Sequence, residues 1–198
     1  SSGAVADAKV IVDTSFGVGS IALHSMEGVF KEKGANLTLD LRNQARAGPV
    51  NEGCGAELVQ KGQVPPCGVN KESDEGEILC SFDGDADRIV FHAFPSAAVP
   101  AWYLLDGDRI ACLFSTFLKT ELEAAGVFQE LRFGCVQTAY ANGASSGYLR
   151  GIIAKGGGGG NRSGGSSNLQ LDFAKTGVKF VHHVAEQYDI GIYFEANG

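Results

Sequence analysis

Three carboxylates stand at alternate positions in a short segment that separates two apolar runs. Asp83, Asp85 and Asp87 follow residues 78–82 and precede residues 89–91. Alternate side chains of an extended chain share a face, so these three charges repel one another unless a cation neutralises them. Carboxylates alone suit a hard divalent ion such as Mg²⁺. The segment therefore predicts a magnesium site, and the alternative is a solvated acidic turn.

A calcium-binding EF-hand loop also carries aspartates at its first, third and fifth positions. That loop requires Gly at its sixth position and Glu at its twelfth. Counting from Asp83, the chain has Arg88 and Phe94 at these positions, and its flanks are typical of strands where an EF-hand has helices. The EF-hand interpretation is therefore rejected.

Composition limits the classes of partner. The chain has 198 residues, 44% of them hydrophobic, with a net charge of −7. Its Lys and Arg residues are scattered, which argues against nucleic acid and anionic membrane as partners. No apolar stretch reaches about 18 residues and no signal peptide is recognisable, so we expect a soluble, cytoplasmic protein. The five cysteines form no C-x-x-C pair, and we expect reduced thiols.

The elements that must position the acidic triplet begin near the N-terminus. Residues 9–12 have strand character, residues 13–20 form a glycine-bearing turn, and residues 22–30 have helical spacing of apolar side chains. Residues 37–41 give the next strand, so a βαβ unit with parallel strands is expected. Gly17 and Gly19 in the turn fall short of a dinucleotide-binding fingerprint.

The acidic triplet itself lies between two predicted strands, 78–82 and 89–91. Residues 102–105 are expected to pair back on the second of these as a hairpin. The proline-bearing stretch between them interrupts the pattern, and we place the boundary between two domains near residue 100.

The second half repeats the order of strand, polar turn and helix. A long helix with apolar residues between positions 110 and 122 is expected to face the core. The remaining predicted elements are strands at 134–138, 169–173 and 189–194 and helices at 148–153 and 178–188. A glycine-rich insertion, residues 155–168, cannot bury apolar area and is predicted to be a surface loop.

Four short segments resemble motifs of one enzyme family. Residues 82–88 (FDGDADR) resemble the metal-binding loop of the α-D-phosphohexomutases. Residues 137–143 (QTAYANG), 175–179 (KTGVK) and 193–198 (YFEANG) resemble the members of that family that act on N-acetylglucosamine phosphates. The last is the most discriminating, because related mutases carry a Glu-x-Ser-Gly sugar loop where this chain has Glu-Ala-Asn-Gly.

The resemblance implies a four-domain enzyme, of which this chain matches domains two and three. Residues 1–100, with the metal loop at 83–88, correspond to domain two, and residues 101–198 correspond to domain three, ending at the sugar loop. Each is expected to be a three-layer α/β/α domain, and the sheets to be mixed but mostly parallel. The phosphoserine loop of domain one and the phosphate-binding loop of domain four have no counterpart, so we expect a fragment that is inactive without those partner domains.

The implied reaction interconverts N-acetylglucosamine 6-phosphate and N-acetylglucosamine 1-phosphate, for UDP-N-acetylglucosamine synthesis. In the family a phosphoserine donates its phosphoryl group to the sugar phosphate, and the bisphosphate that results turns over in the site. By resemblance, Asp83, Asp85 and Asp87 hold Mg²⁺. Arg88 is expected to contact a phosphate, with a loop-pinning salt bridge as the alternative.

The resemblance also assigns residues toward the sugar. Glu195 and Asn197 are expected to bind its 3- and 4-hydroxyl groups, and Lys175 to support acid or base catalysis, with an ordinary surface lysine as the alternative. Two other functions stay open: a non-catalytic module that binds Mg²⁺ and a sugar phosphate, and a phosphoglucomutase or phosphomannomutase. The Glu-Ala-Asn-Gly loop disfavours the second of these.

Overall fold

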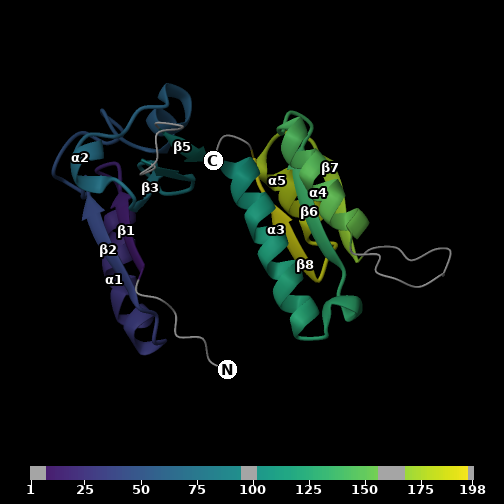
Figure 1. Cartoon of the computed structure of the whole chain (residues 1–198). Helices are drawn as coiled ribbons and strands as arrows, with labels where there is room; N and C mark the ends of the chain where they lie inside the picture. Colours follow the sequence, from purple (N-terminus) through teal and green to yellow (C-terminus); the bar gives the residue numbers. More distant parts are fainter. Residues whose placement is uncertain (1–7, 95–101, 156–167, 196–198) are drawn as a thin grey trace. The chain divides into compact units, whose positions relative to one another are not determined.

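The computed structural model describes residues 8–94, 102–155 and 168–195 (Figure 1). The chain divides into two compact units, the first ending at Asp106 and the second beginning at Gly107. The domain boundary was expected near residue 100, within residues 95–101, which lie outside the described residues. Most of the glycine-rich insertion, residues 156–167, also lies outside them.

The first unit is built on a five-stranded sheet with the order β2-β1-β3-β4-β5. The strands are β1 (Ala8–Asp13), β2 (Leu37–Arg42), β3 (Ile78–Phe82), β4 (Ile89–Ala93) and β5 (Tyr103–Leu105). β1 pairs in parallel with both β2 and β3, whereas β4 is antiparallel to β3 and to β5. The expected βαβ unit and the expected hairpin are both confirmed, and the sheet is mixed.

Helix α1 (Gly19–Glu32) connects β1 to β2, and Gly34, with φ of +68°, follows its end. Two short helices follow β2, a π-helix η1 (Leu58–Gly62) and α2 (Lys71–Asp74). The apolar spacing in residues 22–30 correctly predicted a helix, but it did not predict which side chains are buried. Met26 and Val29 are 44% and 49% exposed.

The core of the first unit lies where the segment between β2 and β3 covers the sheet. Ile11 and Leu79 pack with Val69 and Phe94, while Val90 packs with Ala56 and Val59 around η1. Trp102 contacts both clusters. This arrangement ties the segment that contains η1 to the strands on either side of the acidic loop.

His92 lies in this core and makes the stability of the unit dependent on pH. The side chain is 1% exposed, its Nε2 is 3.0 Å from Ser81 Oγ, and its ring centroid is 4.8 Å from that of Trp102. Burial lowers the pKa of His92 from 6.5 to about 4. Between these values the unfolded chain binds a proton that the folded chain does not, so stability falls as pH falls from about 6.5 to about 4.

We expect the free energy of unfolding to decrease by about 2 kcal/mol between pH 7 and pH 5, because one pKa unit corresponds to roughly 1.4 kcal/mol. Urea unfolding at the two pH values measures this difference. The His92→Gln variant is the matched control and should lose most of the pH dependence. An equal decrease in that variant would assign the effect to other groups.

The second unit contains a three-stranded parallel sheet with the order β7-β6-β8. The strands are β6 (Phe133–Thr138), β7 (Leu169–Ala174) and β8 (Ile190–Tyr193). The helices are α3 (Gly107–Ala124), the 3₁₀ helix η2 (Phe128–Glu130), α4 (Gly143–Lys155) and α5 (Val178–Ala185).

Successive residues of the central strand β6 place helices on both faces of this sheet. Cys135 packs in a cluster with Ala111 of α3 and Leu149 of α4. The next residue, Val136, packs with Val181 of α5 in a second cluster. Because alternate residues of a strand point to opposite faces, α3 and α4 form one layer and α5 forms the other. The predicted α/β fold with mixed, mostly parallel sheets is confirmed.

Helix α3 corrects one expectation about the core. Leu113, Phe114 and Phe117 were expected to face the core, but they are 62%, 53% and 57% exposed. The buried positions of the helix include Ala111 and Ser115. At 100° per residue the apolar side chains of α3 cover about half of its circumference, and only one side of that stripe faces the sheet.

No helix in the described residues is long and apolar enough to cross a membrane.

Candidate functional site

The acidic loop is a tight connection between the antiparallel strands β3 and β4. Asp83 directly follows β3 and its side chain is buried; its Oδ1 accepts a hydrogen bond of 3.1 Å from the backbone N of Arg88. The backbone N of Ala86 donates to the carbonyl of Asp83 at 3.1 Å, and Ala86 has φ of +61°. The loop therefore folds back on Asp83, which holds both of its ends.

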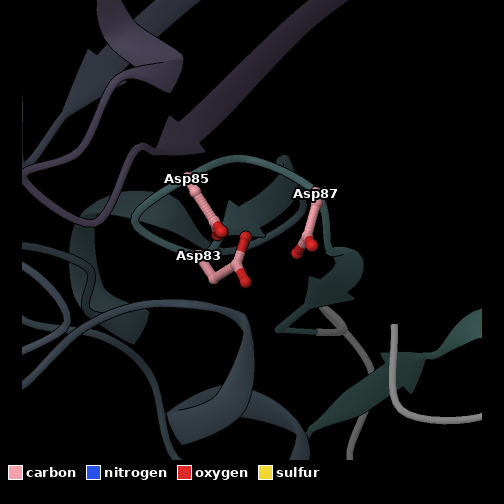
Figure 2. Close-up of side chains that lie close together, drawn as sticks. All are labelled: Asp83, Asp85 and Asp87. Carbon is pink, nitrogen blue, oxygen red and sulfur yellow. The ribbon is translucent and has the colours of Figure 1, made fainter.

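The fold-back brings the three predicted metal ligands together. Figure 2 shows the carboxylates of Asp83, Asp85 and Asp87 pointing toward one another. One oxygen from each lies within 4.8 Å of the others, with Asp83 buried and the other two exposed. Oxygens that coordinate one Mg²⁺ at about 2.1 Å are roughly 3–4 Å apart, and separations of up to 4.8 Å that involve two exposed side chains are close to that spacing. An oxygen-only donor set of this kind fits Mg²⁺.

The charges in the loop act on one another. Burial by itself raises the pKa of Asp83, but hydrogen bonds from the side chain and backbone of Arg88 outweigh it and hold that pKa below its ordinary value. The neighbouring Asp83 carboxylate, through a shared hydrogen bond and through its charge, raises the pKa of the exposed Asp87. Two carboxylates crowded in this way favour any cation that enters between them.

Arg88 already has partners within the first unit. Its Nε donates to Asp83 Oδ2 at 2.6 Å, and its Nη1 lies 3.5 Å from Glu57 Oε2. Hydrogen bonding to Asp83 raises the pKa of the Arg88 guanidinium. The structure thus shows the salt bridge that pins the loop, while a contact between Arg88 and a phosphate stays a prediction.

The glycines after β1 have a role that the sequence did not reveal. The backbone N of Val18 donates to the carbonyl of Gly84 at 3.0 Å, and a Cβ atom at Gly17 would overlap that carbonyl. A Cβ atom at Gly84 would in turn overlap Val50. The turn after β1 and the segment after β2 therefore both pack closely against Gly84 in the acidic loop.

In the second unit, the ends of all three strands meet at Glu195. The Oε1 atom of Glu195, just beyond β8, accepts a hydrogen bond of 2.7 Å from the backbone N of Gly177, which follows β7. Tyr140, which follows β6, donates its hydroxyl to the same atom at 3.5 Å. Ligands of open α/β sheets bind at this carboxyl edge.

The structure brings together some of the predicted sugar-site residues. Lys175 is exposed directly after β7, in the same turn as Gly177, so the Lys-Thr-Gly turn and Glu195 are joined by a hydrogen bond. Asn197 lies outside the described residues. Gly177 and Tyr140 were not identified as contacts of Glu195, although both belong to motifs that the sequence singled out. Their contact depends on the strand order β7-β6-β8, which places β6 between the other two strands, and the motifs do not encode that order.

Comparisons with known proteins give matches to both units. A family model described as "Phosphoacetylglucosamine mutase AMG1, domain III" matches residues 106–198. A phosphoacetylglucosamine mutase of Arabidopsis thaliana is 43% identical over 194 residues, which are 96% of this chain and 31% of that protein. The human enzyme of the same name is 41% identical over 187 residues, or 94% of this chain and 30% of its own length. The chain thus spans about a third of the length of these relatives.

Solved structures agree with these sequence matches. The crystal structure of Aspergillus fumigatus N-acetylphosphoglucosamine mutase in complex with GlcNAc-6P and magnesium is similar with a TM-score of 0.79 and 35% identity, covering 96% of this chain and 35% of that one. An N-acetylglucosamine-phosphate mutase in a substrate complex, described as a member of the α-D-phosphohexomutase superfamily, has a TM-score of 0.80 and 31% identity over 98% of this chain and 33% of its own. The resemblance inferred from the four motifs is confirmed.

Proposed function

The chain is a homologue of the phosphoacetylglucosamine mutases over nearly its whole length, and we propose that it forms the metal-binding and sugar-binding part of an enzyme with that activity. The proposed reaction interconverts N-acetylglucosamine 6-phosphate and N-acetylglucosamine 1-phosphate. The observation that carries the proposal is the convergence of three aspartate carboxylates in a segment similar to a mutase solved with magnesium and GlcNAc-6P.

Asp83, Asp85 and Asp87 are the proposed ligands of Mg²⁺ in the first unit. When bound, the ion supplies electrostatic stabilisation for phosphoryl transfer, a reaction that depends more on positioning and charge than on covalent help. Arg88 is held by Asp83 and Glu57, which fixes the plane of its guanidinium group. From that position Arg88 is proposed to contact a phosphate oxygen through its remaining N–H groups.

Glu195 is the proposed sugar-binding carboxylate of the second unit, together with Asn197. The hydrogen bond from Gly177 is made to Oε1 of Glu195, and its Oε2 is the proposed acceptor for a sugar hydroxyl. Lys175, in the adjoining turn, is proposed to support proton transfer or to contact the transferred phosphate. The phosphoryl donor itself is proposed to come from outside these 198 residues, because no segment resembles the family's phosphoserine loop.

Two assays test this proposal. The 198-residue chain alone is expected to show no interconversion of the two phosphates by ³¹P NMR. A polypeptide of the relatives' length that contains this sequence is expected to interconvert them, and to turn over glucose and mannose phosphates more slowly. Turnover by the 198 residues alone would place the phosphoryl donor within them, and no turnover by the longer polypeptide would favour a non-catalytic module that binds Mg²⁺ and a sugar phosphate.

In the longer polypeptide, Glu195→Gln is expected to lower kcat/KM by roughly 10- to 150-fold, because hydrogen bonds to a charged group contribute about 1.5–3 kcal/mol. Steady-state kinetics with N-acetylglucosamine 6-phosphate measures the change. Glu186→Gln, on the exposed end of α5, is the control and should leave kcat/KM unaltered. Equal values for both variants would remove Glu195 from the sugar site.

A further inference from the structure

A second buried carboxylate lies behind the acidic loop, at the end of β1. Asp13 is 1% exposed, and neutral N–H groups from three separate segments donate to it. Its Oδ1 accepts from the backbone N of Ser15 at 3.0 Å and from Asn43 Nδ2 at 2.8 Å. Its Oδ2 accepts from the backbone N of Gly55 at 2.8 Å.

The three donor residues share an uncommon backbone conformation. Ser15, Asn43 and Gly55 have φ of +58°, +49° and +96°. A left-handed conformation is uncommon for residues other than Gly, although Asn tolerates it better than Ser does, and for Ser15 it requires support from the surrounding structure. The Asp13 carboxylate is the acceptor common to all three residues, so it holds these three positions in place together.

Two of the segments that Asp13 joins, those of Ser15 and Gly55, contact the acidic loop, whereas the carbonyl of Asn43 accepts from the backbone N of Phe16 in the turn after β1. The turn containing Ser15 continues to Val18, whose backbone N donates to the carbonyl of Gly84. Asn51 binds Ser15 twice, through its backbone N at 3.1 Å from the Ser15 carbonyl and through its Oδ1 at 2.9 Å from Ser15 Oγ. Its side-chain amide is also close enough to Gly84 that a Cβ atom there would lie 3.0 Å from Nδ2.

The Gly55 segment contacts the beginning of the acidic loop, next to Phe82. Gly55 lies so close to Ser15 that a Cβ atom would overlap Ser15 Oγ and would lie 3.3 Å from the carbonyl of Phe82, the residue before Asp83. Two residues after Gly55, Glu57 pairs with Arg88. Displacement of the Gly55 segment would therefore disturb both ends of residues 83–88.

We propose that Asp13 is a positioning residue for the metal site: its carboxylate joins three segments at residues of positive φ, two of which contact the acidic loop, so that Asp83, Asp85 and Asp87 are held ready to receive a divalent cation. This inference rests on the proposed metal site. An aspartate suits this role because it offers acceptors only, whereas an asparagine would turn one N–H donor toward another.

Calorimetric titration of the whole chain with Mg²⁺, alongside thermal unfolding without metal, tests the proposal. Asp13→Asn is expected to weaken Mg²⁺ binding by about 10- to 100-fold, as changes behind a metal's direct ligands commonly do. If that variant does not fold, Asn43→Gly removes one donor while tolerating positive φ, and is expected to weaken binding by a smaller factor.

Asp74→Asn is the matched control. Asp74 is equally buried, at 1% exposure, in the same unit, but it accepts from Arg42 Nη1 at 2.7 Å and from the backbone N of Asn70 at 3.0 Å, away from the acidic loop. We expect Asp74→Asn to lower the melting temperature and leave Mg²⁺ affinity within about twofold of the wild type.

Two results would overturn the proposal. The first is wild-type Mg²⁺ affinity in Asp13→Asn, or in Asn43→Gly if Asp13→Asn does not fold. The second is an equal loss of affinity in Asp74→Asn, which would assign the effect to general stability. A parallel titration of Asp85→Ala separates this inference from the metal site itself. If Asp85→Ala retains binding, the metal site is wrong; if only the Asp13 variant retains binding, the positioning role is wrong.

Discussion

Replacing Asp85 by alanine is expected to weaken Mg²⁺ binding to the chain by more than about 100-fold, the upper limit commonly seen for changes outside the direct ligands of a metal. Asp85 contributes one of the three converging oxygens, and its side chain is exposed. Its removal therefore deletes a ligand with little effect on the fold. Isothermal titration calorimetry with the wild type and the variant gives the two dissociation constants.

The control for this experiment is Glu72→Ala, which removes the same charge from an exposed position in α2 of the same unit. That variant should bind Mg²⁺ as the wild type does, since exposed charges at a distance are screened by salt. Unchanged affinity in Asp85→Ala would show that the acidic loop is a solvated turn, the alternative that the sequence leaves open.

The second large effect is expected from Gly17→Ala. The added Cβ would overlap the backbone carbonyl of Gly84, which no side-chain rotation relieves. Overpacking of this kind costs about 1–3 kcal/mol, and a clash with backbone lies at the upper end. We expect the free energy of unfolding to fall by about 3 kcal/mol and Mg²⁺ affinity to fall with it, as measured by urea unfolding and calorimetry.

Gly28→Ala is the matched substitution. Gly28 lies within α1, and a Cβ atom there would have no neighbour within 4 Å. Alanine is the better helix former, so this variant should be more stable by about 0.5–1 kcal/mol. If Gly17→Ala were as stable as the wild type, the close approach of the turn after β1 to the acidic loop would be incorrect.

The local features of the chain could be predicted because they depend on neighbours in the sequence. Alternating carboxylates between two apolar runs located the candidate metal site, and apolar spacing with glycine-bearing turns gave the parallel β1-α1-β2 unit. The family motifs identified the relatives that the comparisons confirm. These signals need only short-range information, which a single sequence contains.

The contacts that were not predicted, and the burial that was predicted wrongly, depend on segments that are distant in the sequence. Asp13 binds residues up to 42 positions away, through Gly55, and no local pattern marks that contact. The contact of Gly177 with Glu195 follows from the strand order β7-β6-β8. In α3, a broad apolar stripe satisfied the helical pattern without showing which side faces the sheet, and so the exposure of Phe114 was not foreseen.

Asp83, Asp85 and Asp87 are proposed to bind one divalent cation together. The most direct test is an anomalous difference map from a crystal of the chain soaked in Mn²⁺, an ion that accepts the same oxygen ligands as Mg²⁺. We predict a single peak between the three carboxylates, at about 2.1–2.2 Å from one oxygen of each. A map in which these carboxylates stay apart with only water between them would rule out a shared cation site in this loop.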